Sequence, residues 1–184
     1  MTARALVTSI ALLAASVAPA AAAATGGPVS VRETDGEYLV VARFTVAEPA
    51  AVVRAVLTDY ANIPRFMPDV QKSTVVEREG TRVRVEQEAV SKYMMFPKRI
   101  QLLLDVEEGA DVLRFSDTCK RSFERYDGSW TISPAGAETE VTYELSARPL
   151  FSVPAFVLRK LLDRNAHAMI AGLRSEIRDR AISP

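Results

Sequence analysis

The chain has 184 residues, and its 23 lysines and arginines balance 23 aspartates and glutamates, so the formal net charge is zero. This balance excludes a broad electrostatic attraction to nucleic acid, and we expect no nucleic-acid partner. One histidine and one cysteine are too few for zinc, haem or copper sites of the usual composition, so we expect no metal and no cofactor.

The first 24 residues have the features of a secretory signal peptide. Arg4 precedes an apolar stretch at 5–17, and Pro19 with the alanines at 20–24 offers small-residue cleavage sites. The stretch is too short and too alanine-rich to span a bilayer stably. We expect cleavage near Ala24 and a periplasmic or secreted protein, the alternative being a disordered or membrane-tethering N-terminus. Cleavage would leave 160 residues with 22 basic and 23 acidic side chains.

Two strands are predicted at the start of the mature chain. Residues 29–34 and 38–46 have strand composition and are joined through Asp35-Gly36, a favoured turn pair. Residues 25–36 are interpreted as a linker that includes the extra first strand, and residues 37–182 as one folded domain.

Two short helices are expected next. Pro49 suits the first turn of a helix, and Asp59 is expected to cap a second helix that Pro64 and Pro68 keep short. The apolar side of the first helix consists of Val52, Val53, Val56 and Leu57.

Residues 70–148 alternate between apolar and polar positions, with turn residues at intervals, as strands of an antiparallel sheet do. The expected strands are 70–79, 82–91, 98–107, 111–119, 123–133 and 139–148. Cys119 falls in one of them and is interpreted as a small buried side chain, the alternative being a reactive thiol.

The segment 154–180 predicts one long amphipathic helix. Its apolar residues recur at helical spacing: Leu158, Leu162, Ala166, Met169, Leu173 and Ile177. A helix this long needs an apolar surface, which the sheet supplies. The expected fold is therefore α+β, a curved antiparallel sheet wrapped around a long C-terminal helix with an internal hydrophobic cavity.

Alternation along the strands and the helical wheel assigns side chains to this cavity, provided the register holds. They are Val85, Gln87, Met94, Phe96, Leu102, Tyr126, Trp130, Tyr143, Leu162, Asn165 and Met169.

Polar members of this set have two interpretations. The amide of Gln87 needs partners from neighbouring strands, water or a ligand. The hydroxyls of Tyr126 and Tyr143 belong to core rings but could reach the cavity, and Asn165 could bind a head group or a packed loop. His167 lies on the outer side of the helix, so we assign no catalytic residue.

The connection Tyr93-Met94-Met95-Phe96-Pro97 is unusually apolar for a loop. It is either a hairpin folded onto the core, or a gate over the cavity or a patch that touches a membrane or a carrier.

The order of several segments resembles the START-like polyketide cyclase/dehydrase and lipid-transport superfamily. These are Phe44-Thr45-Val46 followed by Pro49 and a helix, the segment Asp59 to Val70, the strand with Gly128-Ser129-Trp130, and the long terminal helix. Residues 57–70 are most similar to the coenzyme Q-binding branch.

The resemblance, over about residues 37–180, implies a helix-grip fold whose cavity binds an apolar molecule such as a lipid, a sterol or a polyprenyl quinone. It implies no shared catalytic set. A signal peptide departs from the quinone-binding branch, whose members work inside cells or mitochondria. We expect an exported carrier or binding protein. The alternatives are a cyclase or dehydratase acting in the same cavity and an interaction module with a filled core. The sequence leaves the oligomeric state open.

Overall fold

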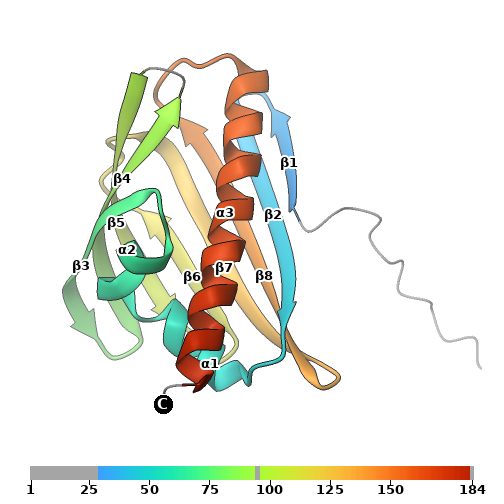
Figure 1. Cartoon of the computed structure of the whole chain (residues 1–184). Helices are drawn as coiled ribbons and strands as arrows, with labels where there is room; N and C mark the ends of the chain where they lie inside the picture. Colours follow the sequence, from blue (N-terminus) through green and yellow to red (C-terminus); the bar gives the residue numbers. More distant parts are fainter. Residues whose placement is uncertain (1–28, 94–95, 183–184) are drawn as a thin grey trace, which may run out of the picture.

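A single eight-stranded sheet forms most of the structure, a computed structural model that describes residues 29–93 and 96–182 (Figure 1). Its strand order is β1-β2-β8-β7-β6-β5-β4-β3, and neighbouring strands are antiparallel. The strands are β1 (Val29–Thr34), β2 (Glu37–Val46), β3 (Val70–Glu79), β4 (Arg82–Tyr93), β5 (Phe96–Glu108), β6 (Val112–Asp117), β7 (Phe123–Ala135) and β8 (Glu138–Pro149). This order confirms the expected antiparallel sheet.

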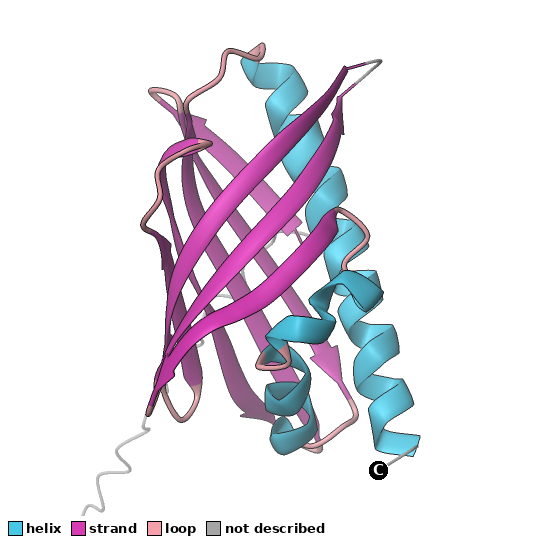
Figure 2. Cartoon of the chain, turned by 90° about the vertical axis from the view of Figure 1, so that its left-hand side faces the viewer, coloured by secondary structure: helices cyan, strands magenta, loops and turns pink. Residues whose placement is uncertain are grey.

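The helices lie on one side of the sheet. They are α1 (Ala50–Leu57), the 3-10 helix η1 (Tyr60–Asn62), α2 (Ile63–Phe66) and α3 (Ala155–Ile182). The sheet bends around α3, which runs along its concave side, and α1 and α2 lie beside the second half of α3 (Figures 1 and 2). The α+β architecture expected from the sequence is confirmed.

The first hairpin turns where the sequence predicts it. Asp35 and Gly36 have φ values of 51° and 79°, both in the left-handed region. Two consecutive residues of positive φ make the turn whose twist matches that of the flanking strands. The turn places β1 against β2, with Thr34 opposite Glu37.

The long helix α3 has two parts with different surroundings. Near its C-terminal end, Leu173 and Ile177 are fully buried in the core. Nearer its start, Leu158 and Ala166 are buried, but Leu162 and Met169 are only half-buried, although they continue the same apolar face. The first part of α3 therefore covers space that the second part fills with side chains.

Asp59 does not cap a helix with its side chain, contrary to the sequence prediction. Its carboxylate instead accepts hydrogen bonds from Asn62 Nδ2 at 3.0 Å and from Arg180 Nη2 at 2.5 Å. The guanidinium is a stronger partner than a backbone amide, because it carries a full charge. Asp59 thus joins the segment after α1 to the end of α3.

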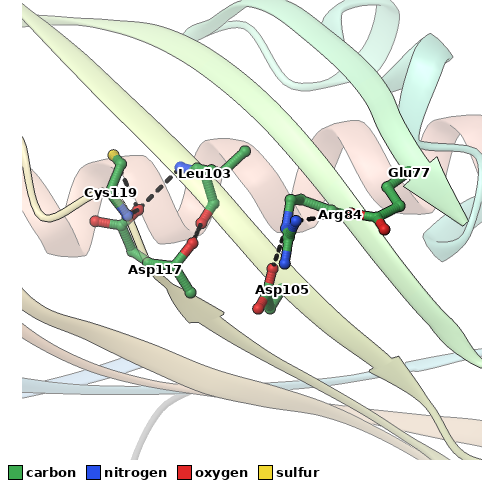
Figure 3. A network of polar contacts seen from close by, with 7 residues as sticks. Glu77, Arg84, Leu103, Asp105, Asp117 and Cys119 are labelled. Atoms are coloured by element: carbon green, nitrogen blue, oxygen red, sulfur yellow. Dashed lines mark hydrogen bonds and ion pairs between the residues drawn. The ribbon is translucent and has the colours of Figure 1, made fainter.

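Cys119 is also placed differently from the prediction, since β6 ends two residues before it and the thiol is half-buried in a turn. The buried carboxylate of Asp117 organises this turn by accepting from Leu103 N at 2.9 Å and from Cys119 N at 3.2 Å (Figure 3). Burial raises the pKa of the thiol. The same view shows Arg84 between Asp105 and Glu77, an ion-pair network of exposed side chains.

Candidate ligand-binding cavity

A cavity of about 480 Å³ lies between the sheet, the first part of α3 and the two short helices. It is about three times the size of a roughly 150 Å³ apolar cavity that binds benzene. The walls are mostly aliphatic and aromatic, since the inward positions of the strands are Val, Ile, Leu, Phe, Tyr and Trp. The interior of this fold is therefore hollow, as a sheet curved around one helix predicts.

The cavity opens where its lining residues reach solvent. Pro68, Lys98 and Ser152 line the cavity and are exposed. They come from the loop after α2, the start of β5 and the loop before α3. The ammonium of Lys98 lies 5.2 Å from the ring centroid of Phe151, which also lines the cavity. The mouth therefore extends from the end of the molecule where α3 begins to the loop after α2.

Aromatic rings from β6, β7 and β8 form one wall. Trp130 stacks obliquely on Tyr143, with ring centroids 4.4 Å apart, and the ring centroid of Phe115 lies 6.1 Å from that of Tyr143. The ring centroid of Tyr126 lies 4.9 Å from that of Phe123. Such close ring pairs hold one another in place, so this wall is a rigid surface for a ligand.

The two tyrosine hydroxyls in this wall stay protonated at neutral pH. Burial raises the pKa of Tyr126, and burial raises the pKa of Tyr143 well above its ordinary value. A hydrogen bond between the two hydroxyls raises the pKa of Tyr143 further and lowers that of Tyr126, for which burial is the larger effect. Both groups can therefore form hydrogen bonds in the cavity, but neither is suited to act as a base.

The two amides have different surroundings. Gln87 Nε2 donates to Ser73 Oγ on the neighbouring strand at 3.2 Å, and its side chain also lines the cavity. The neighbouring-strand interpretation therefore holds for one of its N–H groups. Asn165 also lines the cavity, and its side chain has no hydrogen-bond partner among the residues whose side chains the structure describes, 29–90 and 98–182.

Nine of the eleven residues assigned to the cavity from the sequence line it: Val85, Gln87, Leu102, Tyr126, Trp130, Tyr143, Leu162, Asn165 and Met169. Met94 lies outside the described residues. Phe96 begins β5, and its side chain is also outside them. That these residues contact a ligand stays a prediction.

The sequence did not assign the floor of the cavity. Side chains of α1, η1 and α2 form it: Val56, Leu57, Tyr60, Ile63 and Phe66. The sequence predicted the buried side of α1 from the spacing of its apolar residues. A four-residue helix such as α2 is too short to show a helical repeat, so its inward side could not be predicted. A hydrogen bond from Tyr60 to Glu108 at 2.9 Å fixes this floor to β5.

The only histidine of the chain, His167, does not line the cavity. His167 is exposed on the outer side of α3, where its Nδ1 lies 2.9 Å from the carbonyl oxygen of Asp163. Among the described residues, no three or more His, Cys, Asp or Glu side chains are grouped as metal ligands. In the same part of the chain, every helix is too short or too polar to cross a membrane.

Solved structures share this fold. The protein TTHA0849 from Thermus thermophilus is 25% identical over 79% of this chain and 99% of its own, with a TM-score of 0.67. A STAR-related lipid transfer protein from Xanthomonas axonopodis is 19% identical, over 82% of this chain and 99% of its own, with a TM-score of 0.63. The Zhui aromatase/cyclase from Streptomyces sp. R1128 is 17% identical, over 79% of this chain and 96% of its own, with a TM-score of 0.65.

The sequence itself matches one family. No protein with a curated description matches it. Residues 46–174, which include both short helices, the strands β3 to β8 and most of α3, match the family described as polyketide cyclase / dehydrase and lipid transport. The resemblance noted in the sequence is thereby confirmed at the level of the superfamily, and its coenzyme Q-binding branch stays a prediction. The chain belongs to the polyketide cyclase/dehydrase and lipid transport family.

Proposed function

We propose that this protein binds an apolar small molecule in the cavity and carries it without changing it chemically. The observation that supports this most is a cavity of about 480 Å³ with largely apolar walls. Ligand sites usually have volumes of roughly 300–1,000 Å³ and a few polar groups that orient the ligand. Removing the ligand's apolar surface from water supplies the affinity, at about 25 cal/mol per Å². The volume also argues against a module whose core is filled by its own side chains.

An enzyme of the cyclase or dehydratase type is the second candidate. It is favoured by the hydroxyls of Tyr126 and Tyr143, which lie in the cavity wall and could donate protons. General acid–base catalysis also needs a base, and the raised pKa values make both tyrosines unsuitable. His167 is outside, and Asp69, the carboxylate that lines the cavity, lies in the loop beside the mouth. These placements favour carriage over catalysis.

We further propose that the protein is exported, since residues 1–24 resemble a cleaved signal peptide. N-terminal sequencing of protein from a periplasmic extract should give a start near Thr25. An intact Met1 in protein that stays with the cell body would contradict export.

A polyprenyl quinone is one ligand of suitable chemistry for the cavity, together with lipids and sterols.

A transient contact with a membrane would let such a ligand enter and leave. Leu150 and Phe156 are 57% and 69% exposed, and they flank the mouth-lining segment 151–153. Exposed apolar side chains beside a cavity mouth suit contact with lipid. In a vesicle flotation assay, Leu150→Ser with Phe156→Ser should reduce the vesicle-bound fraction. Equal flotation of the variant and the parent would contradict this contact.

The carrier is tested by native mass spectrometry of protein purified from the periplasm. We expect a population heavier than the mature chain by the mass of one small molecule, which organic solvent extracts. Added back to stripped protein and recovered after a day, this molecule should have an unchanged mass. A changed mass would support the enzyme. Protein that is empty and does not take up the extract would contradict binding altogether.

A further inference from the structure

One strong hydrogen-bond donor in the cavity wall has no acceptor. Trp130 is the only tryptophan of the chain, and it is half-buried in β7 with its ring on the cavity. Its indole N–H finds no acceptor among the residues that the structure describes. An indole can only donate, and a buried indole N–H usually has a partner. The partner is therefore expected to come from the contents of the cavity.

A second donor lies on the same face of the same strand. Tyr126 is four residues before Trp130, so both side chains point to the concave side of the sheet. Its hydroxyl shares a hydrogen bond with that of Tyr143 and has no other partner among the described side chains, so it can still form one hydrogen bond with a ligand. Because both rings are held by aromatic neighbours, these donors keep their positions whether or not a ligand is bound.

The other polar groups in the inner wall do not supply the missing acceptor. Gln87 donates one N–H to Ser73, and its side-chain oxygen belongs to β4, which β5 and β6 separate from β7 in the strand order. Asn165 is on α3, and an amide offers as many donors as acceptors. At β7 the inner wall thus presents an indole donor without an acceptor among the described residues. A ligand that matches it brings acceptor oxygens.

We infer that the ligand carries a carbonyl oxygen that accepts a hydrogen bond from Trp130, with Tyr126 as a second donor. This rests on the proposed binding function and narrows the ligand class to apolar ketones, esters and related carbonyl compounds. A hydrocarbon would leave the donors unpaired in an apolar environment, which lowers affinity. The cavity has room for about three fused rings, judged from the roughly 150 Å³ that benzene needs.

The test compares 9-fluorenone with fluorene, which share a three-ring frame and differ by a carbonyl in place of a methylene. Burial of apolar surface alone favours fluorene, the less polar molecule. We expect 9-fluorenone to bind the protein at least as tightly in equilibrium dialysis. Trp130→Phe keeps an aromatic ring and removes the N–H. It should weaken 9-fluorenone by roughly 2- to 12-fold, the net effect of one hydrogen bond, and leave fluorene within about twofold.

A second measurement uses the unchanged protein. Its single indole N–H gives one signal in a nitrogen-15 spectrum, and a new hydrogen bond should move that signal downfield with 9-fluorenone but not with fluorene. In equilibrium dialysis, Tyr126→Phe combined with Trp130→Phe should reduce the preference for 9-fluorenone over fluorene below that of Trp130→Phe alone.

The outcomes separate the two proposals. If neither probe binds, the binding function itself fails. If fluorene binds and 9-fluorenone gains nothing from Trp130, in either the dialysis or the spectrum, the carbonyl inference is overturned while the binding function stands.

Discussion

Gly172 of α3 lies directly against the carbonyl oxygen of Phe66, the last residue of α2. A Cβ atom built on Gly172 would be 1.9 Å from that oxygen, which is far shorter than non-bonded atoms can approach. The approach of α2 to α3 therefore depends on a residue without a side chain. Since Ile63 and Phe66 also line the cavity, this glycine determines the position of its floor.

Gly172→Ala is expected to destabilise the protein by about 1–3 kcal/mol, as overpacking does. The sign is informative, because replacing glycine by alanine inside a helix normally stabilises by about 1 kcal/mol. Urea unfolding measures the change. Ser175→Ala, at an exposed position on the same helix, is the control and should change the free energy of unfolding by less than about 0.5 kcal/mol. A Gly172→Ala protein more stable than its parent would show that α2 does not rest on α3.

Filling the cavity should weaken binding without unfolding the protein. Ala89 lines the cavity, is half-buried, and lies between Val70 and Ile100 on the neighbouring strands. Ala89→Phe places a ring in the empty space, so we expect affinity for fluorene to fall about tenfold or more, or about 1.4 kcal/mol. Equilibrium dialysis measures it.

The matched control is Ala171→Phe, the same change at an exposed position of α3. It should leave binding unaltered. Binding by Ala89→Phe as tight as that of the parent would place the ligand elsewhere.

Glu37 should make stability depend on pH on the acid side. A hydrogen bond from Ser146 and ion pairs with Arg125 and Arg148 hold the pKa of this carboxyl below its ordinary value. A lowered pKa in the folded state stabilises the protein above the pKa of the unfolded chain, about 4.3, and this is lost as the pH falls through the folded value. Glu37→Gln should therefore destabilise the protein at pH 7, and this effect should shrink as the pH falls below about 4.

Urea unfolding at several pH values measures this difference. Ser146→Ala removes the largest cause of the lowered pKa, so it should flatten the difference between the two pH limits. A constant difference between the parent and Glu37→Gln from pH 7 to pH 3 would contradict the assignment.

The thiol of Cys119 should react slowly. Burial raises its pKa, and the hydrogen bond to Asp117 adds to this effect, so less thiolate is present at a given pH than in the unfolded chain. Because Cys119 is the only cysteine, the uptake of iodoacetamide at pH 8 reports on it alone. We expect slower alkylation in buffer than in urea. Faster alkylation of the folded protein would identify a reactive thiol.

Local sequence patterns predict much of this structure. The period-two alternation of Ile100, Leu102 and Leu104 placed them on one face, and the turn pair Asp35-Gly36 fixed the first hairpin. Alternation works here because one face of the sheet is buried and the other is not, so each side chain has one favourable side. The same logic placed Asn165 towards the cavity and His167 away from it.

Other features depend on contacts between distant segments, which no local pattern records. Asp59 has the sequence context of a helix cap, but it bonds Arg180, which lies 121 residues further along the chain. Cys119 has the context of a strand, but the hydrogen bonds of Asp117 end β6 before it. For Asp59 the distant partner is a charged guanidinium, and for Cys119 it is the backbone N–H of Leu103, which holds the carboxylate of Asp117 in the turn.

The sequence alone determined the class of fold, the faces of the strands and helix, and most of the cavity wall, because solvent exposure acts on each residue separately. Tertiary structure decided how far α3 stands from the sheet, where the cavity opens, and which donors inside it lack partners. These depend on the contact of Gly172 with Phe66 and on the packing of rings around Trp130. Such distances are set by the bulk of side chains from several segments at once, and so they follow only from the assembled fold.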